Sequence, residues 1–360
     1  MFPRARIRNS LLIAVALGIS QPRARALTFN LTYDSSTVGA PSNFFTAFQY
    51  AINFYQNACT DAITINLQVG WGKINGQNLS PGNLGQSSTF QQGFYSFSQV
   101  KSALAGDAKT TNDAIAIAHL PASDPTGGAL FVMANAEAKA LGLLSANASG
   151  LDGSVGFSST ASYTFDPTNR AVSGKFDFIG LASHEITEVM GRYGLGQNGA
   201  SSGRYSPIDL FRYLSSGVLD LAPTNGAYFS IDGGATVINT FNGTGGGDLS
   251  DWLGLTVDSY DRSLTLGARC DVSAGDLIEM DVLGYDLDIP SPILSVTAHG
   301  INSIVISWSS PSSAFTVLTN SDLATTNWHT AGYSITTIDG TNHSVSLAPV
   351  GRNVFFRLKE

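Results

Sequence analysis

The sequence predicts an α+β domain followed by a small all-β module. Over the first 288 residues, helix-like and strand-like segments follow one another without a regular βαβ alternation. A proline-containing joint, IPSPIL at residues 289–294, then interrupts the chain. After the joint, short runs such as SIVISW, FTVLTN and HSVSLA alternate apolar and polar residues, which is typical of strands with one buried face.

The first 26 residues have the three parts of a secretory signal. The start, MFPRARIRNS, is basic, an apolar run extends from Leu11 to Ile19, and Ala24-Arg25-Ala26 fits a small-x-small cleavage site. The apolar run is shorter than the ~20 residues that a membrane-spanning helix needs, although an uncleaved anchor is the alternative. No later segment is long and apolar enough to span a membrane, so we predict a secreted protein.

The charge balance excludes one class of partner. Without residues 1–26 the chain has 14 basic and 27 acidic residues, a formal charge of -13. It contains no cluster of Lys and Arg, and we therefore expect no binding to nucleic acid. Hydrophobic residues make up 43% of the chain, which indicates a globular protein.

The two cysteines leave two interpretations open. Export would permit a disulfide between Cys59 and Cys270, and two buried thiols are the alternative. A metal role is not expected, because neither cysteine has a ligand-type neighbour at short spacing.

The first half of the domain is predicted in this order. LTFNLTYD (27–34) is a strand, and the helical spacing of Phe44, Phe48, Ile52 and Tyr55 predicts a helix over 43–58. AITINLQVGWG (62–72) alternates as a strand does. Further along come a polar glycine-rich loop (72–88), a helix (97–106), a buried strand (113–121), a strand that runs into a helix (128–144) and a strand (154–165).

The second half begins with a helix that carries an unusual motif. In ASHEITEVMGR (182–192), residues four apart face the same way on a helix, so His184 and Glu188 can bind one cation together. Glu185 can then reach the water on that cation, as in the HExxH zinc motif. Here the motif is HExxE, and Glu188 is a carboxylate ligand that moves the preference toward harder cations.

Three stretches resemble the metzincin zinc peptidases, most nearly the matrixin-related exported bacterial members. VGFSSTASYTFD (155–166) resembles the strand that binds extended substrate along the cleft, and FIGLASHEITEVMGR (178–192) resembles the zinc helix, with Gly191 where that family turns its chain. SAGDLIEMDVLGYDL (273–287) resembles the closing helix. The resemblance implies a twisted mixed sheet with an active-site helix over 27–288, a zinc ion, and Glu185 as the general base.

The sequence departs from that family at two ligands. Glu188 stands where the second histidine belongs, and Gly194, which cannot bind a metal, stands at the third position. A third ligand must therefore be a carboxylate, a tyrosine or solvent. Tyr205 and Asp209 occupy roughly the place of the family's methionine turn. Asp209 is the predicted ligand, with a helix N-cap as its alternative role.

Other polar residues of this domain have structural interpretations beside functional ones. Asp248 and Asp251 offer oxygen ligands for calcium, with a loop turn as the alternative. Asp232 is interpreted as a turn residue. His119 is expected to be structural, at the end of a predicted strand, and Met190 is expected to pack in the core.

These observations predict a secreted zinc-dependent peptidase that hydrolyses peptide or protein substrates. His184, Glu188 and Asp209 would hold the metal, and Glu185 would be the catalytic base. The alternative is a non-catalytic exported binding or surface protein on the same fold that has lost its metal. Residues 295–360 are predicted to form a small β-sandwich, which resembles fibronectin-type-III-like modules and would tether or space the catalytic domain.

Overall fold

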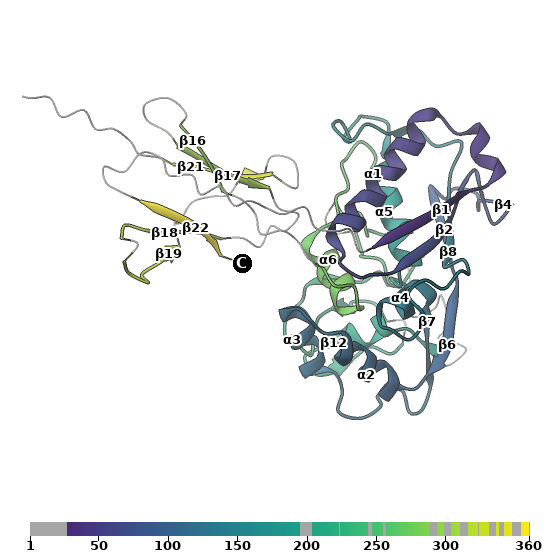
Figure 1. Ribbon diagram of the computed structural model, residues 1–360, viewed down its shortest axis with the longest axis horizontal. Coiled ribbons are helices and arrows are strands. Elements are labelled where there is room, and N and C mark those ends of the chain that lie inside the picture. The colour runs from purple at the N-terminus through teal and green to yellow at the C-terminus, as the bar shows by residue number, and fades with distance from the viewer. Residues whose placement is uncertain are drawn as a thin grey trace, which may run out of the picture.

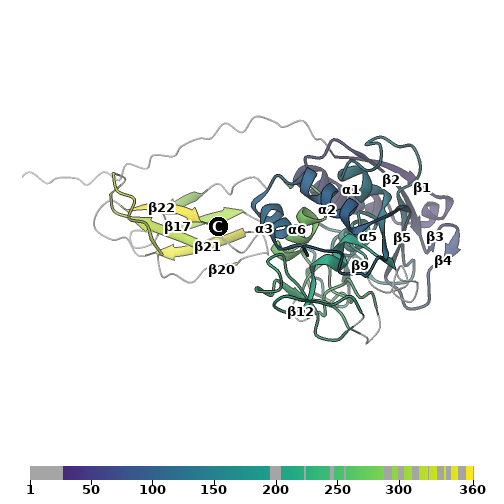
Figure 2. The same cartoon turned by 90° about the horizontal axis from the view of Figure 1, so that it is seen from below.

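The protein is a mixed α+β structure with several small sheets and a few helices, as predicted. The computed structural model describes residues 27–194, 204–222, 224–243, 247–254, 257–287, 294–298, 304–309, 316–322, 324–330, 336–337, 342–347 and 354–359. The expected signal (1–26) and residues 289–293 of the expected linker lie outside the described residues. Figures 1 and 2 show one body built from the chain up to residue 287 and a separate group of C-terminal strands.

The largest sheet of the N-terminal body has four strands in the order β1-β2-β8-β5. β1 (Thr28–Tyr33), β2 (Thr64–Trp71) and β8 (Gly153–Phe157) are parallel, whereas β5 (Gly85–Thr89) pairs with β8 in the antiparallel sense and forms the edge. Every residue of β8 is buried, as expected of a strand between two neighbours, and every residue of β5 is half-buried.

Two helices pack against each other and against this sheet. α1 (Ser42–Ala58) packs on α5 (Phe178–Val189), and α5 packs in turn on β5 and β8. A cluster of aromatic rings joins them: the centroid of the Phe157 ring lies 4.9 Å from that of Phe178 and 5.9 Å from that of Phe44. Burial of each such ring stabilises the fold by roughly 1.5–3 kcal/mol.

A glycine permits the close approach of α5 to the sheet. A Cβ atom at Gly153 of β8 would lie 2.6 Å from a methyl carbon of Val189. The helix that carries the HExxE motif is therefore held directly against the sheet.

A second sheet has three strands, in the order β11-β7-β6. Three short helices lie between these strands in the sequence. The strands are β6 (Gln91–Tyr95), β7 (Leu130–Ala134) and β11 (Arg204–Tyr205). The helices are α2 (Phe97–Asp107), α3 (Thr111–His119) and α4 (Asn135–Ala140).

The predicted strand at 113–121 is wrong, because this segment is the helix α3. A capping box starts it: the Thr110 hydroxyl accepts a hydrogen bond from the Asp113 N–H, and the Asp113 carboxylate accepts one from the Thr110 N–H. His119 ends this helix and its Nδ1 lies 2.8 Å from the Ile115 carbonyl oxygen, which is consistent with a structural role.

The remaining elements of the N-terminal body are short. α6 (Ala274–Val282) closes the domain in the predicted place. The others are η1 (Ser35–Gly39), β3 (Lys73–Ile74), β4 (Gln77–Asn78), β9 (Tyr163–Thr164), β10 (Phe176–Asp177), η3 (Pro207–Phe211), β12 (Arg212–Ser215), β13 (Val218–Leu219), β14 (Tyr228–Phe229) and β15 (Asn239–Thr240).

Both cysteines are free thiols in this structure. Cys59 follows α1 and Cys270 precedes α6, and both are buried. Burial raises the pKa of the Cys59 thiol well above its usual value and that of the Cys270 thiol to about 12. The structure therefore agrees with the second of the two interpretations of the cysteines.

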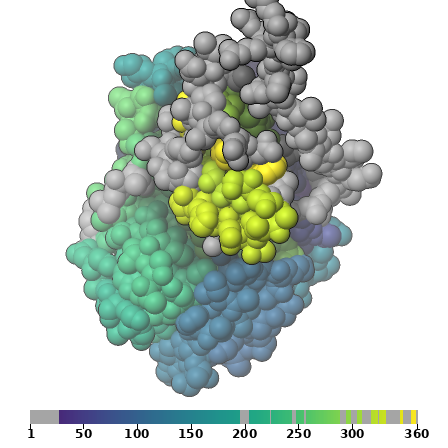
Figure 3. All heavy atoms as spheres, turned by 90° about the vertical axis from the view of Figure 1, so that its left-hand side faces the viewer, coloured from purple at the N-terminus to yellow at the C-terminus, as the bar shows by residue number. Residues whose placement is uncertain are grey.

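The C-terminal strands form two antiparallel sheets, in the orders β16-β17-β21-β20 and β19-β18-β22. Their core contains Ile306, Trp308, Val317 and Val345 and is separate from that of the N-terminal body. Figure 3 looks at the molecule from the side of these strands, coloured yellow-green. The strands are β16 (Ser295–Ala298), β17 (Ile304–Ser309), β18 (Thr316–Asn320), β19 (His329–Thr330), β20 (Thr336–Thr337), β21 (Asn342–Leu347) and β22 (Phe355–Lys359).

Membrane crossing needs a long apolar helix, and none of the described helices meets that requirement.

Three acidic side chains meet where the segment after α1 lies beside residues 286–287, the last described residues of the N-terminal body. Asp61, Asp107 and Asp286 have carboxylate oxygens within 4.8 Å of one another, and Lys109 forms an ion pair with Asp286. Burial, and then the charges of Asp286 and Asp107, raise the pKa of Asp61 from 3.8 to about 7.

Asp61→Asn should stabilise the protein at pH 8 relative to wild type, by about 1–2 kcal/mol after allowance for the nearby lysine. The folded-state pKa lies above the unfolded value, so the linked stability is present below about pH 4 and is lost as the pH rises through about 7. Urea unfolding at pH 4.5 and pH 8 measures the effect. Asp124→Asn is the control: Thr126 lowers the pKa of this exposed acid, so its replacement should bring no gain at pH 8.

Candidate metal centre

The helix α5 has a defined start and a defined end, which fix the side chains between them. The Asp177 carboxylate caps its first turn by accepting a hydrogen bond from the Ile179 N–H. At the other end, the N–H groups of Gly191 and Arg192 donate to the carbonyls of Glu188 and Thr187, in the pattern of a Schellman motif. Gly191 has φ +121°, which favours glycine, and so the chain turns where the sequence predicted.

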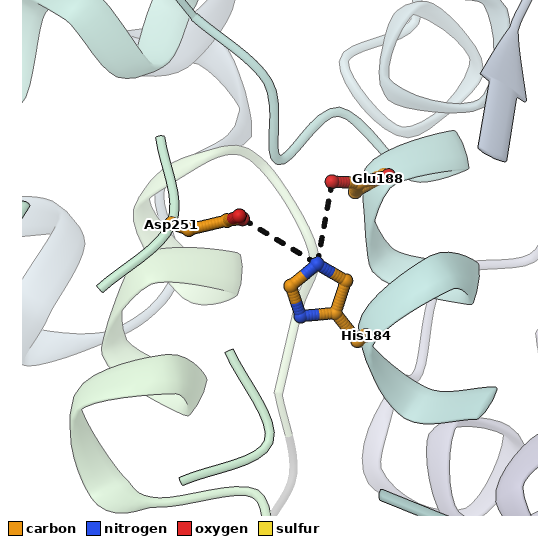
Figure 4. A group of neighbouring side chains, drawn as sticks. All are labelled: His184, Glu188 and Asp251. Atoms are coloured by element: carbon orange, nitrogen blue, oxygen red, sulfur yellow. Dashed lines mark ion pairs between the residues drawn. The ribbon is translucent and has the colours of Figure 1, made fainter. Parts of the chain in front are cut away.

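Three side chains converge in front of this helix. His184 and Glu188 lie one turn apart on α5, and Asp251 comes from a loop on the opposite side (Figure 4). The His184 Nε2 lies 3.4 Å from Glu188 Oε1 and 3.5 Å from Asp251 Oδ1. One potential ligand atom from each of the three residues lies within 4.8 Å of the other two.

Aromatic packing holds the loop that carries Asp251. The next residue, Trp252, is buried, and its ring centroid lies 5.1 Å from that of Phe241 and 5.8 Å from that of Phe229. Its indole Nε1 donates a hydrogen bond of 2.6 Å to Asp276 of α6. Asp251 is therefore fixed by the core and not by its own loop alone.

The hydrogen bonds around this group leave suitable atoms available for a divalent cation. Glu188 Oε1 is buried, faces the His184 Nε2 and has no hydrogen-bond partner, whereas Glu188 Oε2 accepts a hydrogen bond from the Ser87 hydroxyl. The other ring nitrogen of His184, Nδ1, lies 2.9 Å from the Ser259 carbonyl oxygen. Such an outer partner orients a histidine whose Nε2 binds a metal.

The carboxylates dominate the electrostatics of the group. Burial and the Arg192 charge lower the pKa of His184, but Asp251 and Glu188 outweigh them and raise it to about 9. Burial raises the pKa of Glu188, but His184, Arg192 and Ser87 outweigh it and lower it to about 2. The carboxylates of Glu188 and Asp251 therefore favour a positive charge beside them.

Glu185 lies in the same cleft as the group. The cleft has a volume of about 620 Å³ and is lined by the edge strand β5, by α5 and by the loops at 247–251 and 261–264. Glu185 is buried, and burial followed by the charge of Glu188 raises its pKa well above the usual value. Its carboxylate lies against the backbone of Gly85, where a Cβ atom would be 2.3 Å from Glu185 Oε1.

Gly85→Ala should therefore displace the Glu185 carboxylate, because the added methyl group would occupy the same space as that carboxylate. If Glu185 is catalytic, hydrolysis should fall by roughly 10²-fold while metal content is unchanged, since small misplacements of a catalytic group cost about that much. Rates and metal content of the purified variant measure this. Gly106→Ala is the control, because a Cβ atom there meets nothing within 4 Å; a Gly85→Ala variant with the wild-type rate would contradict this geometry.

The predicted third ligand, Asp209, does not lie with the group, and Asp251 takes that place in the structure. Asp209 is in η3, where its carboxylate accepts a hydrogen bond of 2.8 Å from the Ser206 N–H. The alternative role, a helix N-cap, is close to the observed one: Ser206 is the N-cap of η3, and Asp209, at the third helical position, completes the capping box. Tyr205 is also elsewhere, with its ring centroid 5.9 Å from that of Phe131.

The residues considered for calcium lie in the cleft with His184. Asp251 belongs to the His184 group, and Asp248 lies beside Glu188. Burial, and then the charges of Glu188 and Asp251, raise the pKa of Asp248 to about 8. A group that includes a histidine nitrogen suits zinc and similar metals better than calcium, which prefers oxygen ligands.

The strand along the cleft also differs from the expectation. The sequence assigned that place to 155–166, but β8 is covered on both sides by β2 and β5, and β5 forms the cleft wall. Most of β5 falls in the segment that the sequence predicts to be a polar loop, 72–88. The composition of β5, GQSST, gives no apolar alternation that would indicate a strand.

The chain was compared with family models, with curated proteins and with solved structures, and none of the three comparisons found a match.

Proposed function

We propose that the protein is a secreted metal-dependent peptidase with a metzincin-like catalytic domain. His184, Glu188 and Asp251 would hold one divalent cation, zinc in the first instance, and Glu185 would be the general base. The observation that carries the proposal is the buried Glu188 Oε1, which has no hydrogen-bond partner and faces the His184 Nε2 in the cleft that also contains Glu185. Zinc is bound in proteins by histidine nitrogen and by Asp or Glu oxygen, so each of the three residues offers an accepted type of ligand atom.

A cation held by these residues would polarise a water and stabilise negative charge on the substrate carbonyl oxygen. Glu185 would act as the general base toward the attacking water and would pass a proton to the leaving amine. The Ser259 carbonyl fixes the orientation of the His184 ring, and Ser87 holds the Glu188 oxygen that faces away from His184. These contacts keep the ligand atoms in place before a substrate arrives.

A peptide is the substrate class that the cleft supports best. β5 is the edge strand of the sheet, so one side of its backbone is not paired within that sheet. An extended peptide can add to such an edge through main-chain hydrogen bonds. β5 also forms part of the cleft wall beside Glu185 and Glu188, which would bring a bound peptide to the catalytic group.

The proposal includes two expectations about the rest of the chain. Residues 1–26 would direct export and be removed, in agreement with their sequence pattern. The C-terminal sheets would form a sandwich that tethers or spaces the catalytic domain; their separate hydrophobic core supports an independent module.

One observation favours a second candidate, a non-catalytic exported binding protein. Arg192 forms ion pairs with both Asp251 and Glu188, and the raised pKa of His184 adds a further positive charge. The carboxylates can thus be neutralised by the protein without a metal. The two candidates differ in one property, the presence of a bound divalent cation.

The test is metal analysis of the purified protein before and after chelation, together with hydrolysis of a peptide library. The proposal predicts about one zinc or similar ion for each chain, and hydrolysis that chelation abolishes and zinc restores. Protein that binds no divalent cation and hydrolyses no peptide would support the second candidate.

A further inference from the structure

Arg192 is the residue that joins the three members of the candidate metal centre. It is fully buried, with an exposed fraction of 0%. Its Nη1 donates a hydrogen bond of 2.7 Å to Asp251 Oδ1, and its Nη2 lies 3.7 Å from Glu188 Oε1 and donates to the His184 carbonyl at 3.3 Å. One guanidinium group therefore contacts all three residues.

Further contacts fix the orientation of this guanidinium. Its Nε donates a hydrogen bond of 3.1 Å to the Thr187 hydroxyl, and its plane is anchored over the Tyr260 ring, with Cζ 4.4 Å from the ring centroid. The Schellman turn at Gly191 directs the chain back toward the site immediately before Arg192. Arginine suits this place because its planar fork makes several hydrogen bonds at once and keeps its charge.

The two sides of the centre come from distant parts of the chain. His184 and Glu188 are on α5, whereas Asp251 is 59 residues after Arg192 in the sequence. Arg192 lies at the end of the turn that follows α5, and it donates a hydrogen bond directly to the carboxylate of Asp251. The same oxygen, Asp251 Oδ1, accepts this hydrogen bond and faces the His184 Nε2.

We infer that Arg192 is a positioning residue, which holds Asp251 in ligand geometry beside His184 and Glu188 and offsets the charge of the second carboxylate. A ligand set with two carboxylates and one histidine carries one more negative charge than a set with one carboxylate and two histidines. A fixed guanidinium against Asp251 and Glu188 compensates for that charge and so preserves the electrophilic character of a bound cation. This inference rests on the proposed function.

The test measures the affinity for Zn²⁺ and Co²⁺ in the full-length mature protein, by competition with a chromophoric chelator. Arg192→Lys keeps the charge but cannot form the fork to Asp251, Thr187 and the His184 carbonyl. We expect its metal affinity to fall by roughly 10–100-fold, the usual effect of losing an outer-shell partner. The visible absorption bands of bound Co²⁺ should also shift, because the position of one ligand changes.

A double-mutant cycle with Asp251→Asn separates positioning from a general effect on the fold. If Arg192 acts through Asp251, the Arg192→Lys substitution should cost much less affinity in the Asp251→Asn background than in wild type. Equal costs in the two backgrounds would overturn the inference.

Arg170→Lys is the matched control. Arg170 is also a buried arginine, paired with Asp177 and Asp271 at the start of α5, and contacts none of the three ligand residues in the described structure. Its substitution should lower the unfolding temperature and leave metal affinity unchanged. An Arg192→Lys protein that is folded by circular dichroism and binds Zn²⁺ as tightly as wild type would overturn the inference alone, whereas wild-type protein that binds neither metal would overturn the proposed function.

Discussion

Glu185→Gln should reduce peptide hydrolysis by at least the ~10²–10⁴-fold that general-base catalysis contributes. Glutamine has nearly the size of glutamate and keeps hydrogen-bonding capacity, but it cannot accept the proton of a polarised water. Glu185 is not a member of the ligand group, so the variant should bind Zn²⁺ with wild-type affinity. Initial rates on a cleaved library peptide and metal content in the same preparation measure both quantities.

The control is the same substitution at another buried glutamate, Glu137. Glu137 is in α4 and does not line the cleft. Its carboxylate oxygens have no hydrogen-bond partner in the structure. Glu137→Gln should leave the rate unchanged. If Glu185→Gln and wild-type protein hydrolyse the peptide equally fast, Glu185 is not the base.

Asp251→Asn should weaken metal binding by more than the roughly 10–100-fold that an outer-shell partner contributes. The neutral amide replaces an anionic oxygen that faces His184, and it also weakens the ion pair with Arg192. Glu188→Gln should have the same effect, because the group loses its other carboxylate. Titration of the metal-free variants with Zn²⁺ in the presence of a competing chelator measures the affinities.

Asp209→Asn is the comparison that distinguishes the proposed ligand set, which includes Asp251, from the one predicted by the sequence. Asp209 is the third-position member of the capping box of η3, so this variant should lose at most about 1 kcal/mol of stability. Its metal affinity should equal that of wild type. A large loss of affinity in Asp209→Asn but not in Asp251→Asn would restore the ligand set expected from the sequence.

The helical part of the site could be predicted because it is local. The four-residue step from His184 to Glu188 places both side chains on one face of any α-helix, and the structure has the predicted helix there, α5. The end of the helix was also predictable, since Gly191 adopts a backbone conformation that favours glycine. Glu185 lies in the predicted cleft for the same local reason.

Asp251 could not be chosen from the sequence, because its place depends on tertiary packing. Several aspartates follow the motif, and it is the burial of Trp252 against Phe241 and Phe229, together with the hydrogen bond from Arg192, that brings this one to His184. Asp209 was favoured by its similarity in position to a family feature. The local signal at that residue was the capping box with Ser206, which describes its observed role.

The two misassigned segments have related causes. The residues of α3 alternate Ala and Ile, a pattern that suits either a strand or a helix, and the capping box at Thr110 and Asp113 favours the helix. The edge strand β5 contains Gly, Gln, Ser and Thr, so its strand character comes from its pairing with β8 and not from its own composition.

The most direct test of the metal centre is anomalous diffraction at the zinc absorption edge from crystals of the protein grown with Zn²⁺. We expect one strong peak within bonding distance of His184 Nε2, Glu188 Oε1 and Asp251 Oδ1, at about 2.0–2.2 Å. A peak at Asp61, Asp107 and Asp286 alone, or no peak in the cleft, would contradict it.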